Sequence, residues 1–151
     1  MSVVILLDTG PLGMVSSPPH ATPLNEQANA WLETQLAQGK RVLIPEIADY
    51  ELRRELLRAG KIKGLAKLNG LKRSLGYVPL NTRIMLQAAE YWAQSRRMGR
   101  PNAGDAELDG DVILAAQAAW LQAKGHEIIV ATTNVKHLKH FVDARLWSDI
   151  P

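Results

Sequence analysis

The 151-residue sequence contains no cysteine, which excludes disulfide bonds and thiolate metal sites and favours a reducing compartment. It also lacks any apolar run near the roughly 20 residues that a membrane span requires. No basic region precedes the first apolar segment, so we predict no signal peptide. With 46% hydrophobic and 22% charged residues, the composition is that of a globular protein. We therefore predict one domain, 1–151, in the cytoplasm and not attached to a membrane.

The apolar run from Val3 to Leu7 ends directly at Asp8, and a Gly-Pro pair follows. A continuous apolar run with β-branched residues is typical of a strand buried on both faces, as at the centre of a parallel sheet. Ligands of open α/β sheets bind outside the carboxyl ends of the strands. We therefore expect the Asp8 carboxylate to lie where the chemistry takes place.

Predicted strands and helices alternate along the rest of the chain. We expect strands at 42–44, 77–80, 128–131 and about 145–147, a short helical turn at 10–15, and helices at 23–38, 46–59, 62–75, 82–98 and 109–124. This alternation implies right-handed crossovers and a parallel sheet covered by helices on both faces. The strand at 77–80 contains a proline, which favours an edge position. The sequence thus predicts a three-layer α/β/α sandwich.

Three further polar side chains could meet Asp8 at this edge of the sheet. Asn134 follows the strand at 128–131, Asp111 opens a buried helix, and Glu51 lies at the border of an apolar helical stripe. Each acid has an ordinary alternative role. Asp8 could cap a turn, Asp111 could favour the helix dipole, and Glu51 could pair with an arginine of its own helix. The case for a functional site rests on their joint placement.

Carboxylates that lie close together repel one another, by about 4 kcal/mol for two charges near 4 Å apart at an effective dielectric near 20. Either one acid takes up a proton or a divalent cation joins them. An oxygen ligand set without cysteine suits Mg²⁺ or Mn²⁺ better than zinc. His137 and His140 are three residues apart, but no third zinc ligand stands out.

Positive charge is concentrated between residues 53 and 73, although the net charge of the chain is only +3. Against the single acid Glu55, this segment carries Arg53, Arg54, Arg58, Lys61, Lys63, Lys67, Lys72 and Arg73. One interpretation is the solvated face of a helical hairpin, and the other is a surface for a polyanion such as nucleic acid. The leucines of the same segment also allow a dimer or partner interface.

Four motifs, in order along nearly the whole chain, resemble those of the PIN-domain family. They are Asp8-Thr9 after the first strand, Glu51-Leu52-Arg53-Arg54 on a helix, Asp111-x-x-Leu114-Ala115-Ala116 opening a buried helix, and Thr132-x-Asn134 after the next strand. In size and layout the chain is similar to the ribonuclease toxins of bacterial VapBC toxin–antitoxin pairs. The resemblance implies a parallel sheet of strand order 3-2-1-4-5 and a metal-dependent ribonuclease.

The resemblance also implies roles for individual residues and partners. The catalytic acids, which would hold Mg²⁺ or Mn²⁺, are Asp8, Glu51 and Asp111, with Asp109 as a further metal ligand and Thr9 and Asn134 in support. RNA would be gripped by Arg53, Arg54, Arg58, Lys61, Lys63 and Lys67. The implied partners are an RNA substrate, a cognate antitoxin and a second copy in a homodimer. Asp109 can reach the site only from a non-helical cap position, because helical residues two apart point about 200° apart.

Two other functions stay open on the sequence alone. A haloacid dehalogenase-like phosphatase also carries a nucleophilic aspartate after its first strand, but its second aspartate would fall on Gly10. A catalytically inactive PIN-like module that binds RNA or protein is favoured by the uncharged Asn134. Metal binding would separate such a module from a nuclease.

Overall fold

A computed structural model describes residues 3–99 and 104–151 of the chain. At its centre is a five-stranded sheet in the order β3-β2-β1-β4-β5. The strands are β1 (Val3–Leu7), β2 (Arg41–Pro45), β3 (Tyr77–Val78), β4 (Glu127–Thr132) and β5 (Ala144–Leu146). Each neighbouring pair is parallel. The predicted strand order is confirmed, and β3 lies at the edge of the sheet as expected.

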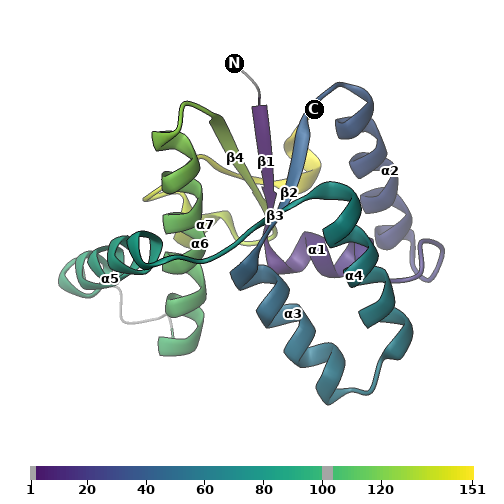
Figure 1. Cartoon of the computed structure of the whole chain (residues 1–151), viewed down its shortest axis with the longest axis horizontal. Coiled ribbons are helices and arrows are strands. Elements are labelled where there is room, and N and C mark those ends of the chain that lie inside the picture. Colours follow the sequence, from purple (N-terminus) through teal and green to yellow (C-terminus); the bar gives the residue numbers. More distant parts are fainter. Residues whose placement is uncertain (1–2, 100–103) are drawn as a thin grey trace.

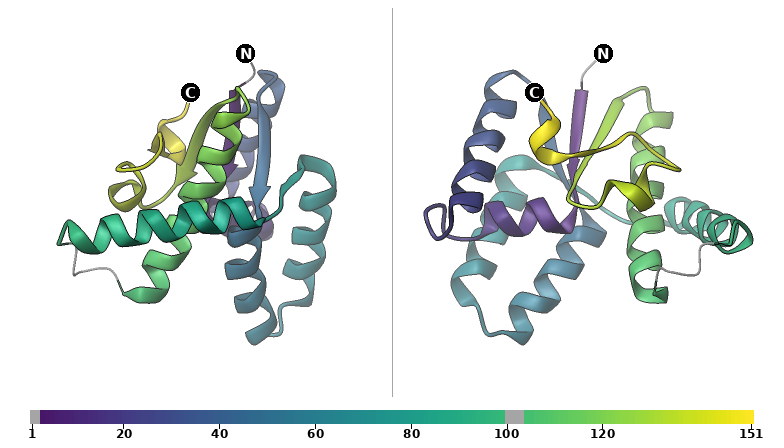
Figure 2. Two further views of the ribbon diagram at one scale, coloured as in Figure 1. Left: turned by 60° about the vertical axis from the view of Figure 1, so that its left-hand side comes forward. Right: turned by 180° about the vertical axis from the view of Figure 1, so that it is seen from behind.

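Helices cover both faces of the sheet (Figure 1). One face packs against α1 (Thr9–Ser16), α2 (Pro23–Ala37) and α4 (Ile62–Leu75), and the opposite face packs against α6 (Asp105–Ala123). The view from behind in Figure 2 shows α1 and α2 to the left of the strands and α6 to the right. Outside α6 lies α5 (Thr82–Arg97). The three-layer α/β/α sandwich is thus confirmed.

Three further helical segments complete the described chain. α3 (Glu46–Arg58) continues directly from β2 and forms, with α4, a hairpin that projects beyond the carboxyl ends of the strands (Figure 1). α7 (Val135–Leu138) follows β4, and a 3₁₀ turn at Trp147–Asp149 follows β5. None of the helices in the described ranges is long and apolar enough to cross a membrane.

The central strand β1 divides the core into two halves. Val4 and Leu6 face α6, whereas Ile5 and Leu7 face α1, α2 and α4, and all four are at most 1% exposed. Burial of such a side chain contributes about 1.5–3 kcal/mol relative to exposure. Because both of its faces are buried, β1 is held firmly, and so is the position at which it ends.

The start of α6 differs from our prediction. The helix begins at Asp105, capped by Gly104, and not at Asp109. The reason is that Leu108 is buried with Val112 against α5, which extends the apolar stripe of α6 one turn toward the N-terminus. The four-residue helix α7 was not predicted, because so short a segment shows no helical periodicity.

Candidate functional site at the carboxyl ends of the strands

Asp8 lies at the carboxyl end of β1, where the chain turns into α1. Its Oδ1 accepts a hydrogen bond from the backbone N–H of Thr9 at 2.7 Å, so Asp8 does cap the helix, as the alternative interpretation held. Its Oδ2 accepts a hydrogen bond from the hydroxyl of Thr132 at 2.7 Å. Thr132 ends the adjacent strand β4 and is fully buried. Both oxygens of this carboxylate are therefore oriented by donors from two elements of the fold.

Glu51 reaches the same place from α3. Its Oε1 accepts a hydrogen bond from the Thr9 hydroxyl at 2.8 Å. Its other oxygen lies against the backbone of α6, because a Cβ added at Gly110 would be only 2.6 Å from Oε2. Gly110 thus leaves the space that this carboxylate occupies. The inward position predicted for Glu51 is what the structure shows.

Asp111 is the next residue along α6 and is the third acid of the cluster. Its Oδ2 lies 3.2 Å from Nδ1 of His137, which belongs to α7. The side chains of Asp111 and His137 are 21% and 31% exposed, so both lie at the rim and not in the core. The three acids therefore come from three different elements, β1, α3 and α6, and meet at one edge of the sheet.

The electrostatics of the three carboxylates are linked. Burial raises the pKa of Asp8, partly offset by its hydrogen bonds from Thr132 and Thr9. Burial also raises the pKa of Glu51, against the hydrogen bond from Thr9, and the negative charge of Asp8 adds to the rise. For Asp111, burial and then the charge of Asp8 raise the pKa to about 6, with His137 acting in the opposite direction. Arg54 acts in the opposite direction on the pKa of Glu51, so positive groups at the rim only partly offset the negative charge of the cluster.

This donor set fits a hydrated oxygen-bound cation. Within residues 3–99 and 104–151, no three acidic or histidine side chains are grouped closely enough to hold a metal ion. Mg²⁺, however, usually retains several waters and takes only one or two protein carboxylates. One or two of these carboxylates with several waters, in a chain without cysteine, match that requirement better than they match a closed zinc site.

Asp109 and Asn134 do not join the three acids in the structure. Asp109 lies inside α6, so the non-helical position that it required is not present, and it instead lines a cavity of about 390 Å³ between α5 and α6. Asn134 caps α7 at the same edge of the sheet, but its side chain is exposed. Among residues 3–99 and 104–151, only its backbone N–H is engaged, with the Thr132 hydroxyl at 2.9 Å. Neither residue is therefore included in the site that we propose below.

Three residues of the site were not assigned a role from the sequence. Thr132 had a usable signal, because it directly follows Ala131, the partner of Leu7 in the pairing of β1 with β4. His137 follows the same strand after a short turn, which places it at the same edge of the sheet. The role of Gly110 could not be predicted from the sequence, because no neighbouring residue indicates that the distant Glu51 packs against it.

The basic segment is not a uniform free surface. Arg53 donates two hydrogen bonds to Asp49, at 2.9 and 3.2 Å, and one to the side-chain oxygen of Asn69 at 2.8 Å. The Asp49 side chain is only 9% exposed and also lies 3.8 Å from Lys72 Nζ. These contacts tie α3 to α4. Arg53 therefore holds the two helices of the hairpin together.

The remaining predicted RNA contacts divide in the same way. Lys67 donates to the backbone oxygen of Ser17 at 3.1 Å, and Arg58 pairs with Glu55 on the surface. Arg54 lies over the ring of Tyr50, 5.1 Å from its centroid. Lys61 and Lys63 are exposed and have no acid within ion-pair distance among the described residues. Of the six predicted RNA contacts, Lys61 and Lys63 at the end of the hairpin are therefore exposed without an acid or aromatic partner among the described residues.

Solved structures from several bacteria contain chains with the same fold. For VapBC2 from Rickettsia felis bound to a DNA fragment from its promoter, the TM-score is 0.70 at 16% identity, covering 94% of this chain and 97% of that chain. For FitAcB from Neisseria gonorrhoeae, the TM-score is 0.68 at 21% identity, with coverage of 97% and 99%. For VapBC-1 from nontypeable Haemophilus influenzae, the TM-score is 0.69 at 18% identity, with the same coverage.

By sequence, the chain matches no family model and no curated protein. At identities of 16–21%, the structural likeness establishes the fold and not the activity. The parallel order β3-β2-β1-β4-β5 and the flanking helices agree with that likeness. The chain therefore has the PIN-like α/β/α fold predicted from its motifs, similar to that of VapC-type proteins.

Proposed function

We propose that this chain is a metal-dependent endoribonuclease and the toxin of a toxin–antitoxin pair. The observation that carries the proposal is the convergence of Asp8, Glu51 and Asp111 from β1, α3 and α6. Burial raises the pKa of all three, and the charge of Asp8 further raises the pKa of Glu51 and of Asp111. Clusters of perturbed carboxylates in α/β folds are typical of functional sites. The fold shared with chains of VapBC complexes supports this choice of reaction.

In the proposed reaction, water attacks an RNA phosphodiester in line with the leaving oxygen. Asp8, Glu51 and Asp111 would hold Mg²⁺ or Mn²⁺, which when bound acidifies water and stabilises charge on the phosphoryl oxygens. Asp111, at the rim of the site with its Oδ2 beside His137, or Asp8 would orient the attacking water or accept its proton. Thr9 and Thr132 keep Glu51 and Asp8 oriented by donating a hydrogen bond to each.

The partners that we propose are an RNA substrate, a cognate antitoxin and a second copy of the chain. The antitoxin is supported by the structural neighbours, which are VapBC complexes, two of them bound to DNA. The formation of a homodimer and the cytoplasmic location of the protein remain predictions. Analytical ultracentrifugation of the purified chain would measure the oligomeric state directly.

The proposal is tested by RNA cleavage with purified protein. End-labelled RNA is incubated with the wild type, Asp8→Asn and Asp111→Asn in Mg²⁺, in Mn²⁺ and in EDTA, after circular dichroism has shown that each variant is folded. We expect cleavage by the wild type only, and only with a metal ion. Each substitution removes one anionic ligand while keeping the side-chain shape. Equal cleavage by all three proteins, or cleavage that persists in EDTA, would contradict the proposal.

A binding module without catalytic activity is the second candidate, favoured by the uncharged and exposed side chain of Asn134. Mn²⁺ titration calorimetry separates the two functions, because a nuclease of this kind must bind the ion and a pure binding module need not. The phosphatase alternative has lost its support. A second aspartate would be needed at Gly10, where even a Cβ would lie 2.8 Å from the Thr133 hydroxyl oxygen.

A further inference from the structure

Each of the three acids is held by a donor from another element, and one of these donors, His137, has no role so far. Glu51 and Asp8 each accept a hydrogen bond from a threonine hydroxyl, at 2.8 and 2.7 Å. Asp111 instead has Nδ1 of His137 at 3.2 Å from its Oδ2. An ionised carboxylate has no hydrogen to donate, so Nδ1 carries the hydrogen in this contact and donates it. Asp111 is therefore oriented in the same manner as the other two acids.

The position of His137 is set by the burial of its own helix. α7 has only four residues, which is too short to be stable alone. The next residue, Leu138, is fully buried in the half of the core that contains α6. This burial leaves the His137 ring at the rim beside Asp111. The backbone that carries the ring is thus fixed relative to α6, as a residue that orients a side chain of α6 requires.

The same turn of the chain also holds a second acid. The hydroxyl of Thr132 accepts a backbone N–H from the following turn at 2.9 Å and donates to Oδ2 of Asp8. The end of β4 therefore contacts Asp8 through Thr132, and α7 contacts Asp111 through His137. Because the two acids come from β1 and α6, this one segment fixes where they lie relative to each other.

Two other roles explain the contact of His137 with Asp111 less well. One is a stabilising ion pair, but side chains that are 31% and 21% exposed gain little from such a pair. The other is a direct metal ligand. Within residues 3–99 and 104–151, no third acidic or histidine side chain is close enough to form a metal-binding group with these two. The orientation of Asp111 is what remains for the contact to provide.

We infer that His137 is a positioning residue, which donates from Nδ1 to Oδ2 of Asp111 and keeps that carboxylate in the orientation that binds the metal ion. The inference rests on the proposed function, in which the three acids hold Mg²⁺ or Mn²⁺. It adds a residue that acts through one of the acids. Loss of a side chain that hydrogen-bonds a metal ligand typically lowers metal affinity by about 10–100-fold.

The test is Mn²⁺ titration calorimetry of the full chain near neutral pH, with His137→Leu and His137→Asn. Leucine and asparagine have similar shapes, but only asparagine has a donor nitrogen as many bonds from Cβ as Nδ1 of histidine. We expect His137→Leu to lower Mn²⁺ affinity by about 10–100-fold and His137→Asn to stay near the wild-type value. Circular dichroism and urea unfolding in EDTA show whether each variant is folded and equally stable.

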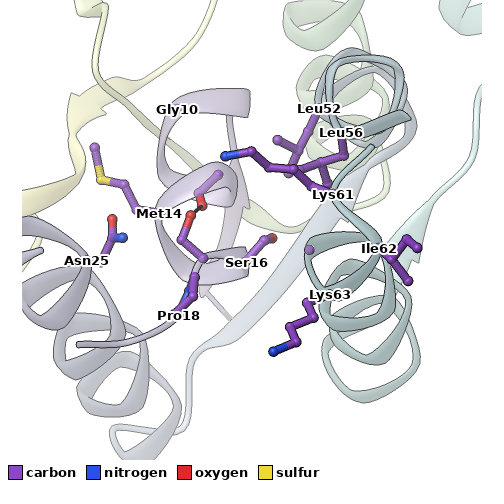
Figure 3. Close-up of a pocket in the computed structure, with 13 residues that line it drawn as sticks. Gly10, Met14, Ser16, Pro18, Asn25, Leu52, Leu56, Lys61, Ile62 and Lys63 are labelled. Atoms are coloured by element: carbon purple, nitrogen blue, oxygen red, sulfur yellow. Dashed lines mark hydrogen bonds between the residues drawn. The ribbon is translucent and has the colours of Figure 1, made fainter. Parts of the chain in front are cut away.

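Asn25→Leu is the matched control, because it makes the same exchange of amide for leucine away from the acids. Asn25 is half-buried in a pocket between α1 and the α3–α4 hairpin, and Figure 3 shows its side chain there. The lining of that pocket contains none of the three acids. Asn25→Leu should therefore bind Mn²⁺ like the wild type.

A second metal ion separates positioning from direct ligation. Imidazole nitrogen is a good ligand for Ni²⁺, whereas Mn²⁺ prefers oxygen. If His137 acts through Asp111, the Ni²⁺ and Mn²⁺ affinities of His137→Leu should fall by the same factor, and His137→Asn should restore both. A much larger loss of Ni²⁺ affinity, not restored by asparagine, would make His137 a ligand and overturn the positioning role.

The positioning role is also overturned if His137→Leu binds Mn²⁺ like the wild type, or if the wild type binds no Mn²⁺. A loss of stability in His137→Leu with unchanged Mn²⁺ affinity would assign the contact to folding alone. The RNA cleavage assay tests the proposed function separately. A wild type that does not cleave, together with weaker Mn²⁺ binding by His137→Leu only, removes the nuclease and keeps the positioning role. Cleavage by the wild type with unchanged Mn²⁺ affinity in His137→Leu removes only the positioning role.

Discussion

Replacement of Gly110 by alanine should weaken metal binding and RNA cleavage while leaving the free energy of unfolding nearly unchanged. Gly110 lies inside α6, and a Cβ there would be 2.6 Å from Oε2 and 3.2 Å from Cδ of Glu51. Both distances are far inside van der Waals contact, so the Glu51 carboxylate must move by roughly an ångström. The clash is with the end of a flexible side chain and not with backbone. We therefore expect Gly110→Ala to fold.

The two energetic effects of this substitution on folding nearly cancel. Alanine in a helix interior is favoured over glycine by about 1 kcal/mol. Displacement of Glu51 weakens the 2.8 Å hydrogen bond that it accepts from Thr9, which costs about 1 kcal/mol. The free energy of unfolding should thus change by less than about 1 kcal/mol. Misplacement of one of three candidate ligands should lower metal affinity by about 10–100-fold.

The assay combines urea unfolding, Mn²⁺ titration calorimetry and RNA cleavage. Gly70→Ala in α4 is the matched control, since a Cβ there meets nothing within 4 Å. It should stabilise the fold by about 0.5–1 kcal/mol and leave Mn²⁺ affinity unchanged. If Gly110→Ala binds Mn²⁺ and cleaves RNA like the wild type, the position of Glu51 against α6 does not contribute to the site.

Two further predictions concern buried charge. In EDTA, the free energy of unfolding should rise as the pH falls from about 7 toward 4, because the pKa of Asp111 is about 6 in the folded protein and near 3.8 when unperturbed. This rise in the free energy of unfolding should be about 2 kcal/mol smaller for Asp111→Asn than for the wild type. An identical pH profile for the two proteins would refute the assignment of the raised pKa to Asp111. Arg53→Ala should cost about 2 kcal/mol in urea unfolding, because it leaves the buried Asp49 with Lys72 at 3.8 Å as its remaining ion pair among the described residues. Arg58→Ala should have no measurable effect.

Local sequence patterns were sufficient for most of the elements and for the three acids. The continuous apolar run of β1 predicts a strand buried on both faces, and Asp8 is placed at a sheet edge simply because it follows that run. The apolar stripe of α3 likewise places Glu51 half inward. Such predictions succeed because helical and strand periods are properties of neighbouring residues.

Helix ends and charge pairs were less accessible from the sequence. α6 begins four residues before the expected start because the buried position of Leu108 depends on contact with α5, and not on the residues beside it. Arg53, predicted to contact RNA, is bound by Asp49 and Asn69. Sequence shows that a segment is basic, but only packing decides which cations find an acid.

By itself, the sequence determined which segments form helices and which form strands, because their apolar residues repeat at the helical or the strand spacing. The motifs pointed to the acids, and the family resemblance that they carry implied the strand order. Only the tertiary structure decided how those acids are held. The hydrogen bond from Thr132 to Asp8 joins residues 124 positions apart, and the contact between Asp111 and His137 joins α6 to α7. Contacts of this kind follow from strand register and helix packing across the whole sheet, so no local pattern contains them.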